Sequence, residues 1–400
     1  MQGARTRGHP TALGAIGAMI RGPAPHAVLI VGPPGIGKTT LAADLAAGLL
    51  CTATEASARP CRACRACRLV EHGSHPDLHR LGPEGPGRQV VIGGAGSKSR
   101  GVRDLITDLA LLPVEGGARV AIVDGASRMN EDAQAALLKT LEEPPDGVTI
   151  VLCADAEEPL LPTIRSRCAR VRLGPVATRD VEGILADAAS VEPALAARLA
   201  RISGGRPGVA LAWAADADAL RARDELVRTL LDLVDQRPAV RLAAVRAAMT
   251  LASSMEPAPA TDPDVASVTR STRGRTARPP SAPSERPSER DAAEVDDGST
   301  AAVQRAPASE RRRAAERLIE LWTDVARDIA LCQRGIPGAV REIGLLDETS
   351  AIAARLDEPA VAEFLERLGR AAVLLASNVS PELVIDDLAL AVPVPTRSAA

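Results

Sequence analysis

The chain has 400 residues, and its 48 Lys and Arg residues nearly balance its 51 Asp and Glu residues, which leaves a formal net charge of −3. This balance excludes a uniformly basic nucleic-acid-binding protein and leaves any contact with DNA to local arginine patches. Aromatic residues are 1% of the chain, too few for a platform on which single-stranded bases stack.

The first 175 residues alternate short apolar runs with helical patterns. Residues 51–76 are rich in cysteine, arginine and histidine and are expected to be irregular. Because strands that alternate with helices form parallel sheets, residues 1–175 are predicted to form an α/β domain whose parallel sheet carries helices on both faces. The predicted strands are residues 27–31, 77–81, 90–92, 120–123, 149–153 and 170–173, and the helices are residues 38–50, 102–112 and 131–143.

After residue 175 the strand pattern ends and only helical spacing remains. We expect a small helical lid at residues 176–215, followed by an all-α domain built from residues 216–254 and 309–395. Residues 255–308 are rich in Pro, Ser and charged residues and have too few apolar side chains to offset their ordering entropy, so they are predicted to be disordered. The helical patterns cover residues 178–202, 208–235, 240–253, 309–334, 337–356, 358–377 and 381–391.

No apolar run reaches the length of about 20 residues that a bilayer-spanning helix needs. The run at residues 12–20 follows two arginines and imitates a signal peptide, but Gly14 and Gly17 interrupt it, and a strand follows shortly after. We therefore expect a cytoplasmic chain with no membrane segment.

A phosphate-binding loop is predicted at residues 32–39, which read GPPGIGKT and match the pattern G-x-x-x-x-G-K-[ST]. The loop follows a predicted strand and opens a predicted helix, and its glycines let backbone N–H groups surround phosphates at the helix N-terminus. Lys38 would reach the β- and γ-phosphates, and the Thr39 hydroxyl would bind Mg²⁺. The predicted nucleotide-binding residues are Gly32, Pro33, Pro34, Gly35, Ile36, Gly37, Lys38, Thr39, Thr40 and Asp124.

Asp124 ends the predicted strand at residues 120–123 and is expected to hold the Mg²⁺ together with Thr39. In hydrolysing relatives the next residue is usually Glu, which prepares the attacking water, whereas this chain has Gly125. Since positioning of water is a large part of the catalysis, we expect bound nucleotide to turn over slowly, and ATPase activity of the chain itself to be weak or absent.

Four cysteines lie within a short loop, Cys51, Cys61, Cys64 and Cys67, and their number favours a metal site over disulfides in a chain without a signal sequence. Four thiolates suit a closed, tetrahedral, structural zinc site. An iron–sulfur cluster is the alternative, but the ferredoxin pattern requires a further Cys-Pro after a three-residue gap, and Arg68–Glu71 stands there. His72 and His75 are possible substitute ligands.

Taken together, these features resemble the clamp loader subunits of bacterial DNA polymerase III, which belong to the AAA+ family. The most specific matches are the stretches LLKTLEEPP at residues 137–145 and SRC at residues 166–168, in that order. The resemblance is strong over residues 26–175, weaker in the lid, and limited to helical character in the C-terminal helices, which would form the ring-building collar. It implies an AAA+ fold with ATP and Mg²⁺ at the loop and a zinc module at residues 51–76.

The resemblance also implies a role for Arg167, which alone reads as a solvated surface residue. In this family the Arg of Ser-Arg-Cys is an arginine finger that points at the γ-phosphate bound by the neighbouring subunit. Three departures separate the chain from the gamma/tau motor subunits. Gly125 replaces Glu, and the stretch Cys153-Ala154-Asp155 stands where a polar sensor of the γ-phosphate is expected. Gly208 falls near the position where the lid of motor subunits carries an Arg on the nucleotide, with Arg206 two residues away.

These departures fit the delta prime group, in which the chain would be a mainly structural member of a hetero-pentamer with gamma/tau and delta subunits. That complex loads the sliding clamp onto primed DNA as part of the polymerase holoenzyme, in the cytoplasm at the nucleoid-associated replisome. The alternative is a hydrolysing gamma/tau-type ATPase, in which an acid such as Asp155 replaces the missing Glu. A third possibility, a stand-alone P-loop kinase or helicase, is disfavoured by the cysteine loop and by residues 137–145.

Overall fold

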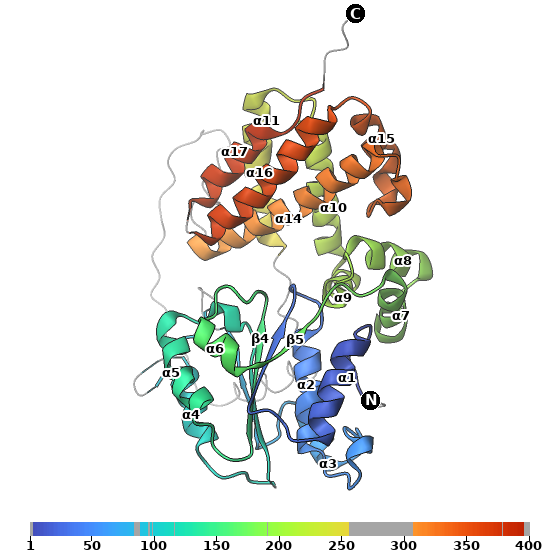
Figure 1. Cartoon of the computed structure of the whole chain (residues 1–400). Coiled ribbons are helices and arrows are strands. Elements are labelled where there is room, and N and C mark those ends of the chain that lie inside the picture. Colours follow the sequence, from blue (N-terminus) through green and yellow to red (C-terminus); the bar gives the residue numbers. More distant parts are fainter. Residues whose placement is uncertain are drawn as a thin grey trace, which may run out of the picture. The chain divides into compact units, whose positions relative to one another are not determined.

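The computed structural model describes residues 3–83, 89–94, 97, 99–115, 117–189, 191–255, 307–377 and 379–395. The chain divides after Ala215 into two compact units, which are coloured blue to green and green to red in Figure 1. We call them unit 1, which ends at Ala215, and unit 2, which begins at Asp216. The segment predicted to be disordered, residues 255–308, lies outside the described residues apart from Met255, Pro307 and Ala308.

Unit 1 is built on a five-stranded parallel sheet in the order β2-β3-β4-β1-β5. The strands are β1 (Ala27–Val31), β2 (Leu78–Leu81), β3 (Arg119–Val123), β4 (Val148–Ala154) and β5 (Ala169–Arg172). The predicted strand at residues 90–92 is wrong, because Val90 forms only an isolated bridge with Met129. All the other predicted strands are present.

Helices cover both faces of this sheet, as predicted (Figure 1). The helices are α1 (Pro10–Arg21), α2 (Lys38–Leu50), α4 (Val102–Leu109), α5 (Glu131–Glu142) and α6 (Pro162–Arg167), and a 3₁₀ turn, η2, spans Ala126–Arg128. Successive side chains of a strand point to opposite faces, so Val28 and Ile30 of β1 enter the core beneath α1 and α2, whereas Ala27 and Leu29 enter the core beneath α4, α5 and α6.

The cysteine-rich segment is more ordered than the sequence indicated. It contains a 3₁₀ turn, η1 (Ala56–Ala58), and a helix, α3 (Arg65–Glu71). The helix begins where the Cys64 sulfur accepts a hydrogen bond from the backbone N–H of Cys67, so a cysteine takes the capping role that Ser or Asp usually has. The expectation of an irregular segment at residues 51–76 is therefore wrong for residues 65–71.

The last part of unit 1 is helical and consists of α7 (Thr178–Ala189), α8 (Pro193–Ile202) and α9 (Pro207–Ala215). The sequence indicated one helical stretch from 178 to 202, but α8 starts separately, because Pro193 favours a first helical position and the Glu192 side chain caps the N–H of Leu195.

Unit 2 is all helical and packs its core around Trp322 and Phe364. Residues 337–356, predicted to be one helix, contain two 3₁₀ turns, η4 (Pro337–Ala339) and η5 (Ile343–Leu345), before α15. The buried Asp328 carboxylate accepts the N–H groups of Arg341 and Glu342, which draws this backbone away from a helical path. The helices are α10 (Ala217–Leu233), α11 (Pro238–Ser254), α14 (Ala308–Gln333), α15 (Leu346–Ala353), α16 (Glu358–Ala376) and α17 (Pro381–Ala391).

Among the described residues, no helix combines the length and the apolar character needed to cross a membrane.

Candidate nucleotide and metal sites

The phosphate-binding loop follows the carboxyl end of β1, which lies between β4 and β5 in the sheet, and leads into α2. Ligands of parallel α/β sheets bind at this edge, beyond the carboxyl ends of the strands. Gly35 and Gly37 have φ angles of +76° and +104°, a backbone region that glycine adopts without strain. The loop conformation therefore depends on these two glycines.

Lys38 turns back into the loop and is almost fully buried. Its ammonium donates to the carbonyl oxygens of Gly32 at 2.7 Å and Pro33 at 3.0 Å, and it pairs with Asp155 Oδ1 at 2.7 Å. An ammonium has three N–H donors, so these contacts occupy all of them. A phosphate can reach Lys38 only by replacing one of these partners.

Thr39, the residue after Lys38, lies beside Asp124, which follows β3. The Thr39 hydroxyl donates to Asp124 Oδ1 at 3.3 Å, and the same oxygen accepts the N–H of Gly125 at 3.0 Å. A hydroxyl beside a carboxylate at the start of a phosphate-loop helix is the donor set that holds Mg²⁺ in P-loop proteins, so these residues fit a Mg–nucleotide. Around them, Ile36 is buried and Pro33, Pro34, Gly35 and Thr40 are exposed.

Asp155 follows β4 and faces the start of the loop, since Ala154 of β4 pairs with Val31 of β1. Its backbone N–H donates to the Ser127 hydroxyl at 3.3 Å, and its Oδ2 lies 3.9 Å from the Arg128 guanidinium. The sequence suggested Asp155 as a replacement for a missing catalytic Glu and placed it in the segment where a sensor of the γ-phosphate is expected. In the structure the Asp155 carboxylate contacts two positively charged side chains, Lys38 and Arg128.

Two further contacts fix the loop from outside, and the sequence did not indicate either. The backbone N–H of Gly208, at the start of α9, donates to the Gly35 carbonyl at 2.8 Å. The ring of the buried His9 lies 3.1 Å from the Ile36 carbonyl through Nε2. Gly208 was expected near the nucleotide, and it lies against the loop itself. Arg206 hydrogen-bonds the Ser203 carbonyl at 3.0 Å.

The four cysteines that sequence spacing singled out come together, and their Sγ atoms all lie within 4.8 Å of one another. They are placed to bind a metal ion. Cys51 and Cys67 are buried, whereas Cys61 and Cys64 are partly exposed. Burial raises the pKa of Cys64, but hydrogen bonds from Cys67 and Thr52 outweigh it and lower the pKa to about 6, while burial raises the pKa of Cys67.

An ion pair fastens the cysteine loop to α2: Arg62, between two of the cysteines, pairs with Asp44 of α2. Arg62 Nε also donates to the Gly3 carbonyl at 2.8 Å. Asp44 is 1% exposed and accepts the backbone N–H groups of Arg5, at 3.0 Å, and Thr6, at 2.8 Å. One buried carboxylate thus joins the N-terminal segment, the cysteine loop and the phosphate-loop helix.

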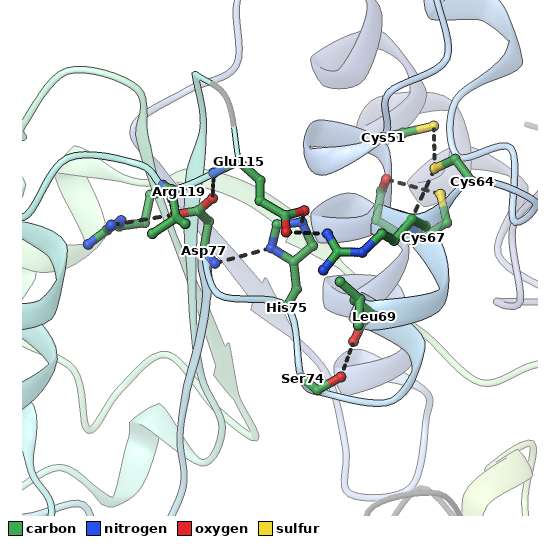
Figure 2. Close-up of polar contacts among 12 residues, drawn as sticks. Cys51, Cys64, Cys67, Leu69, Ser74, His75, Asp77, Glu115 and Arg119 are labelled. Carbon is green, nitrogen blue, oxygen red and sulfur yellow. Dashed lines mark hydrogen bonds and ion pairs between the residues drawn. The ribbon is translucent and has the colours of Figure 1, made fainter.

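A second network connects the cysteine module to the sheet (Figure 2). Arg65 of α3 pairs with Glu115, whose carboxylate lies 3.8 Å from His75 Nε2, and His75 Nδ1 accepts the N–H of Asp77 at 3.1 Å. Burial lowers the pKa of His75, and nearby Glu115 offsets this only in part, so the surroundings favour the neutral ring. His75 is therefore part of this network and is not among the four clustered ligands.

Asp77 is the centre of that network. It is 1% exposed, accepts the N–H groups of Val114 at 2.7 Å and Glu115 at 2.8 Å, and lies 3.4 Å from the Arg119 guanidinium. Burial alone would raise the pKa of Asp77, but these two N–H groups and the charge of Arg119 outweigh it and lower the pKa.

Arg167 is the last residue of α6, and its side chain is 35% exposed. It pairs with Glu142, at the end of α5, at 2.7 Å and donates to the Thr163 carbonyl at 3.0 Å. The guanidinium is thus held at the protein surface by contacts with α5 and α6.

The fold and loop define an α/β P-loop protein whose parallel sheet is followed by a small helical segment and an all-helical unit. Residues 16–177 match the family described as DNA polymerase III, delta subunit. The chain is 39% identical over 184 residues to the DNA polymerase III subunit delta′ of Pseudomonas aeruginosa, which covers 46% of this chain and 53% of the relative. It is also 34% identical over 160 residues to subunit tau of Escherichia coli, which covers 40% of this chain and 23% of the relative.

The matched part therefore spans about half the length of the delta′ relative and less of tau. Among solved structures, a DNA polymerase III gamma subunit-related protein from Thermotoga maritima is 16% identical, with 91% of this chain and 99% of that chain covered and a TM-score of 0.36. The predicted resemblance to the DNA polymerase III clamp loader subunits, delta′ and gamma/tau, is confirmed by the sequence matches.

Proposed function

We propose that the chain is a delta′-type subunit of a bacterial clamp loader and serves mainly as a structural member. It would join gamma/tau and delta subunits in a hetero-pentamer that loads the sliding clamp onto primed DNA, in the cytoplasm at the replisome. Residues 1–175 would be the AAA+ domain, 176–215 the lid, and residues 216–254 and 309–395 the collar. The similarity to delta′ and tau subunits supports this assignment.

The observation that carries the structural role is the missing acid after β3. Asp124 is followed by Gly125, whose φ of +61° suits glycine and which has no side chain to prepare a water molecule. The other nearby acid, Asp155, is paired with Lys38 at 2.7 Å. We therefore expect hydrolysis of ATP to be performed by neighbouring subunits.

In this proposal the loop residues 32–40 still bind a nucleotide. Lys38 would contact the phosphates, and Thr39 and Asp124 would hold Mg²⁺, which supplies charge neutralisation of the phosphate oxygens when bound. The four cysteines would bind structural zinc. A tetrahedral zinc with Zn–S bonds of about 2.3 Å places its sulfurs about 3.8 Å apart, and the Sγ atoms of Cys51 and Cys64 are 3.9 Å apart.

Arg167 would act in trans as an arginine finger on the γ-phosphate that the neighbouring motor subunit binds. Its place at the end of α6 and its partial exposure support this role, because a finger has to leave its own surface to reach another chain. Its partner Glu142 would hold the guanidinium ready when the neighbour is absent.

The test is steady-state ATP hydrolysis by the reconstituted complex with wild-type chain, Arg167→Ala or Arg170→Ala. Arg170 is a matched control, because it is an exposed arginine three residues away that pairs with Glu157 of its own chain at 3.5 Å. We expect Arg167→Ala to reduce turnover of the complex at least 10-fold, a lower limit set well below the factor of about 10³ to 10⁵ that an arginine finger contributes at one site, and Arg170→Ala to leave it unchanged. Equal turnover in all three complexes would contradict the finger.

A hydrolysing gamma/tau-type ATPase is the second candidate, and the match to tau over 160 residues favours it. The rate of the purified chain alone separates the two functions. A structural subunit is nearly inactive by itself, whereas motor-like turnover by the lone chain would show that another acid replaces the Glu missing at position 125.

A further inference from the structure

The acid that follows β4 contacts the lysine of the phosphate-binding loop. The lysine of a phosphate loop binds the β- and γ-phosphates of a nucleotide. Here Asp155 Oδ1 lies 2.7 Å from the Lys38 ammonium, so a carboxylate of the protein already neutralises this cation.

The position of Asp155 is fixed by its surroundings. Its backbone follows β4 next to Gly32, with the Gly32 N–H donating to the Ala154 carbonyl at 3.2 Å. The Ser127 hydroxyl accepts the Asp155 N–H, and Arg128 lies 3.9 Å from the second carboxylate oxygen. The carboxylate is thus directed to Lys38 from a rigid strand end.

Lys38 has no donor to spare for a further anion. Two of its N–H groups bind the carbonyl oxygens of Gly32 and Pro33, which belong to the loop itself, and the third binds Asp155. An anion on Lys38 competes with Asp155 and stays close to its negative charge. Each additional phosphate charge at this place therefore raises the repulsion, because like charges a few ångströms apart repel strongly near a protein surface.

We propose that Asp155 makes this phosphate loop selective for a nucleoside diphosphate over the corresponding triphosphate. The β-phosphate of a diphosphate replaces a loop carbonyl on Lys38 while Asp155 keeps its contact, whereas the terminal phosphate of a triphosphate meets the Asp155 carboxylate. The inference rests on the nucleotide binding in the proposed function, and it adds which nucleotide the site prefers.

The same residue would behave differently as the base of a hydrolysing site. If Asp155 activated water, Asp155→Asn would lower turnover of ATP and leave the relative affinities of the two nucleotides unchanged. If Asp155 selects against the last phosphate, Asp155→Asn tightens binding of the triphosphate. The ratio of the two affinities is therefore the quantity that separates the roles.

The experiment is calorimetric titration of the full chain with Mg·ADP and with the Mg complex of a non-hydrolysable imido analogue of ATP. The wild type is expected to bind Mg·ADP about 10- to 100-fold more tightly than the analogue, the size of effect that a like-charge contact gives. Asp155→Asn keeps the shape and removes the charge, and it is expected to bring the two affinities to within a few-fold.

Asp146→Asn is the matched control, because this exposed Asp precedes β4 at the opposite end of the same strand and gives the same change in net charge. It should retain the wild-type ratio. Thermal unfolding with each nucleotide is a second readout and shows that the variants fold. Equal affinities in the wild type, an unchanged ratio in Asp155→Asn, or no binding of either nucleotide by the wild type would overturn the proposal. The role of Arg167 as an arginine finger is measured separately, by ATP hydrolysis in the complex. That role and the nucleotide selectivity set by Asp155 can therefore fail independently.

Discussion

Arg62 in the cysteine loop and Asp44 in α2 form an ion pair across 18 residues of sequence, and the carboxylate is 1% exposed. The same carboxylate accepts the backbone N–H groups of Arg5 and Thr6. Three segments therefore depend on one side chain, and two of them carry the candidate metal and nucleotide sites. This contact makes the cysteine loop a brace for the phosphate-loop helix.

Replacement of Asp44 by Ala should destabilise the chain by about 3–5 kcal/mol, because it leaves a partly buried guanidinium and two N–H groups without their partner. Urea unfolding of the full chain measures this loss. Asp187→Ala is the control, since Asp187 also pairs with an arginine of the N-terminal segment, Arg7, but is 63% exposed. An exposed pair contributes about 0–1 kcal/mol, and equal losses in the two variants would contradict the bracing role.

Removal of the metal should weaken the cysteine module. Cys64→Ser takes away one of the four clustered sulfurs, so bound zinc, measured by mass spectrometry of the metal, should fall from about one per chain to well below one, with a lower Tm. Cys332→Ser changes a half-buried cysteine of unit 2 outside the cluster and should keep the metal. Full metal content in Cys64→Ser would argue against ligation by these four cysteines.

Gly208→Ala should destabilise unit 1, although Ala normally favours a helix. A Cβ at this position would lie 3.0 Å from the Gly35 oxygen and 3.1 Å from the Gly35 Cα, and the backbone of the loop has little room to move. We expect a loss of about 1–3 kcal/mol. Gly183→Ala, in α7, meets no atom within 4 Å and should gain about 0.5–1 kcal/mol. Urea unfolding compares the two variants. A higher free energy of unfolding in both would show that the contact between α9 and the phosphate-binding loop is not tight.

Asp77 should make the stability of unit 1 decrease at low pH. Its folded pKa is lowered, so the unfolded chain binds the proton more readily; the stabilisation is complete above the unfolded pKa of about 3.9 and is lost as the pH falls through the folded pKa. Unfolding free energies from pH 7 downward should fall below about pH 4 in the wild type. Asp77→Asn should be less stable at pH 7 and show a shallower decline in that window. If the free energies of unfolding of both proteins declined in parallel with pH, Asp77 would not contribute to the acid sensitivity.

Much of the fold followed from local patterns. The strand at residues 27–31 and the helix at residues 38–50 have the predicted bounds, because a buried apolar run and the glycines of the loop are local signals. The sequence did not predict helix α3 or the turns before α15. Cys64 caps α3, and Asp328 accepts a backbone hydrogen bond from the turn segment, and secondary-structure propensity includes neither contact. The strand at residues 90–92 was predicted in error, since Val90 found only one bridging partner.

The sequence by itself determined the composition of the two candidate sites. The order of glycines, Lys38 and Thr39 is a chemical requirement of a phosphate loop, and the spacing of four cysteines is one of a metal site, so both can be read along the chain. Only the tertiary structure decided which residues oppose them. Asp155 meets Lys38 across 117 residues and Asp44 meets Arg62 from another element, because strand order and helix packing bring distant charges together.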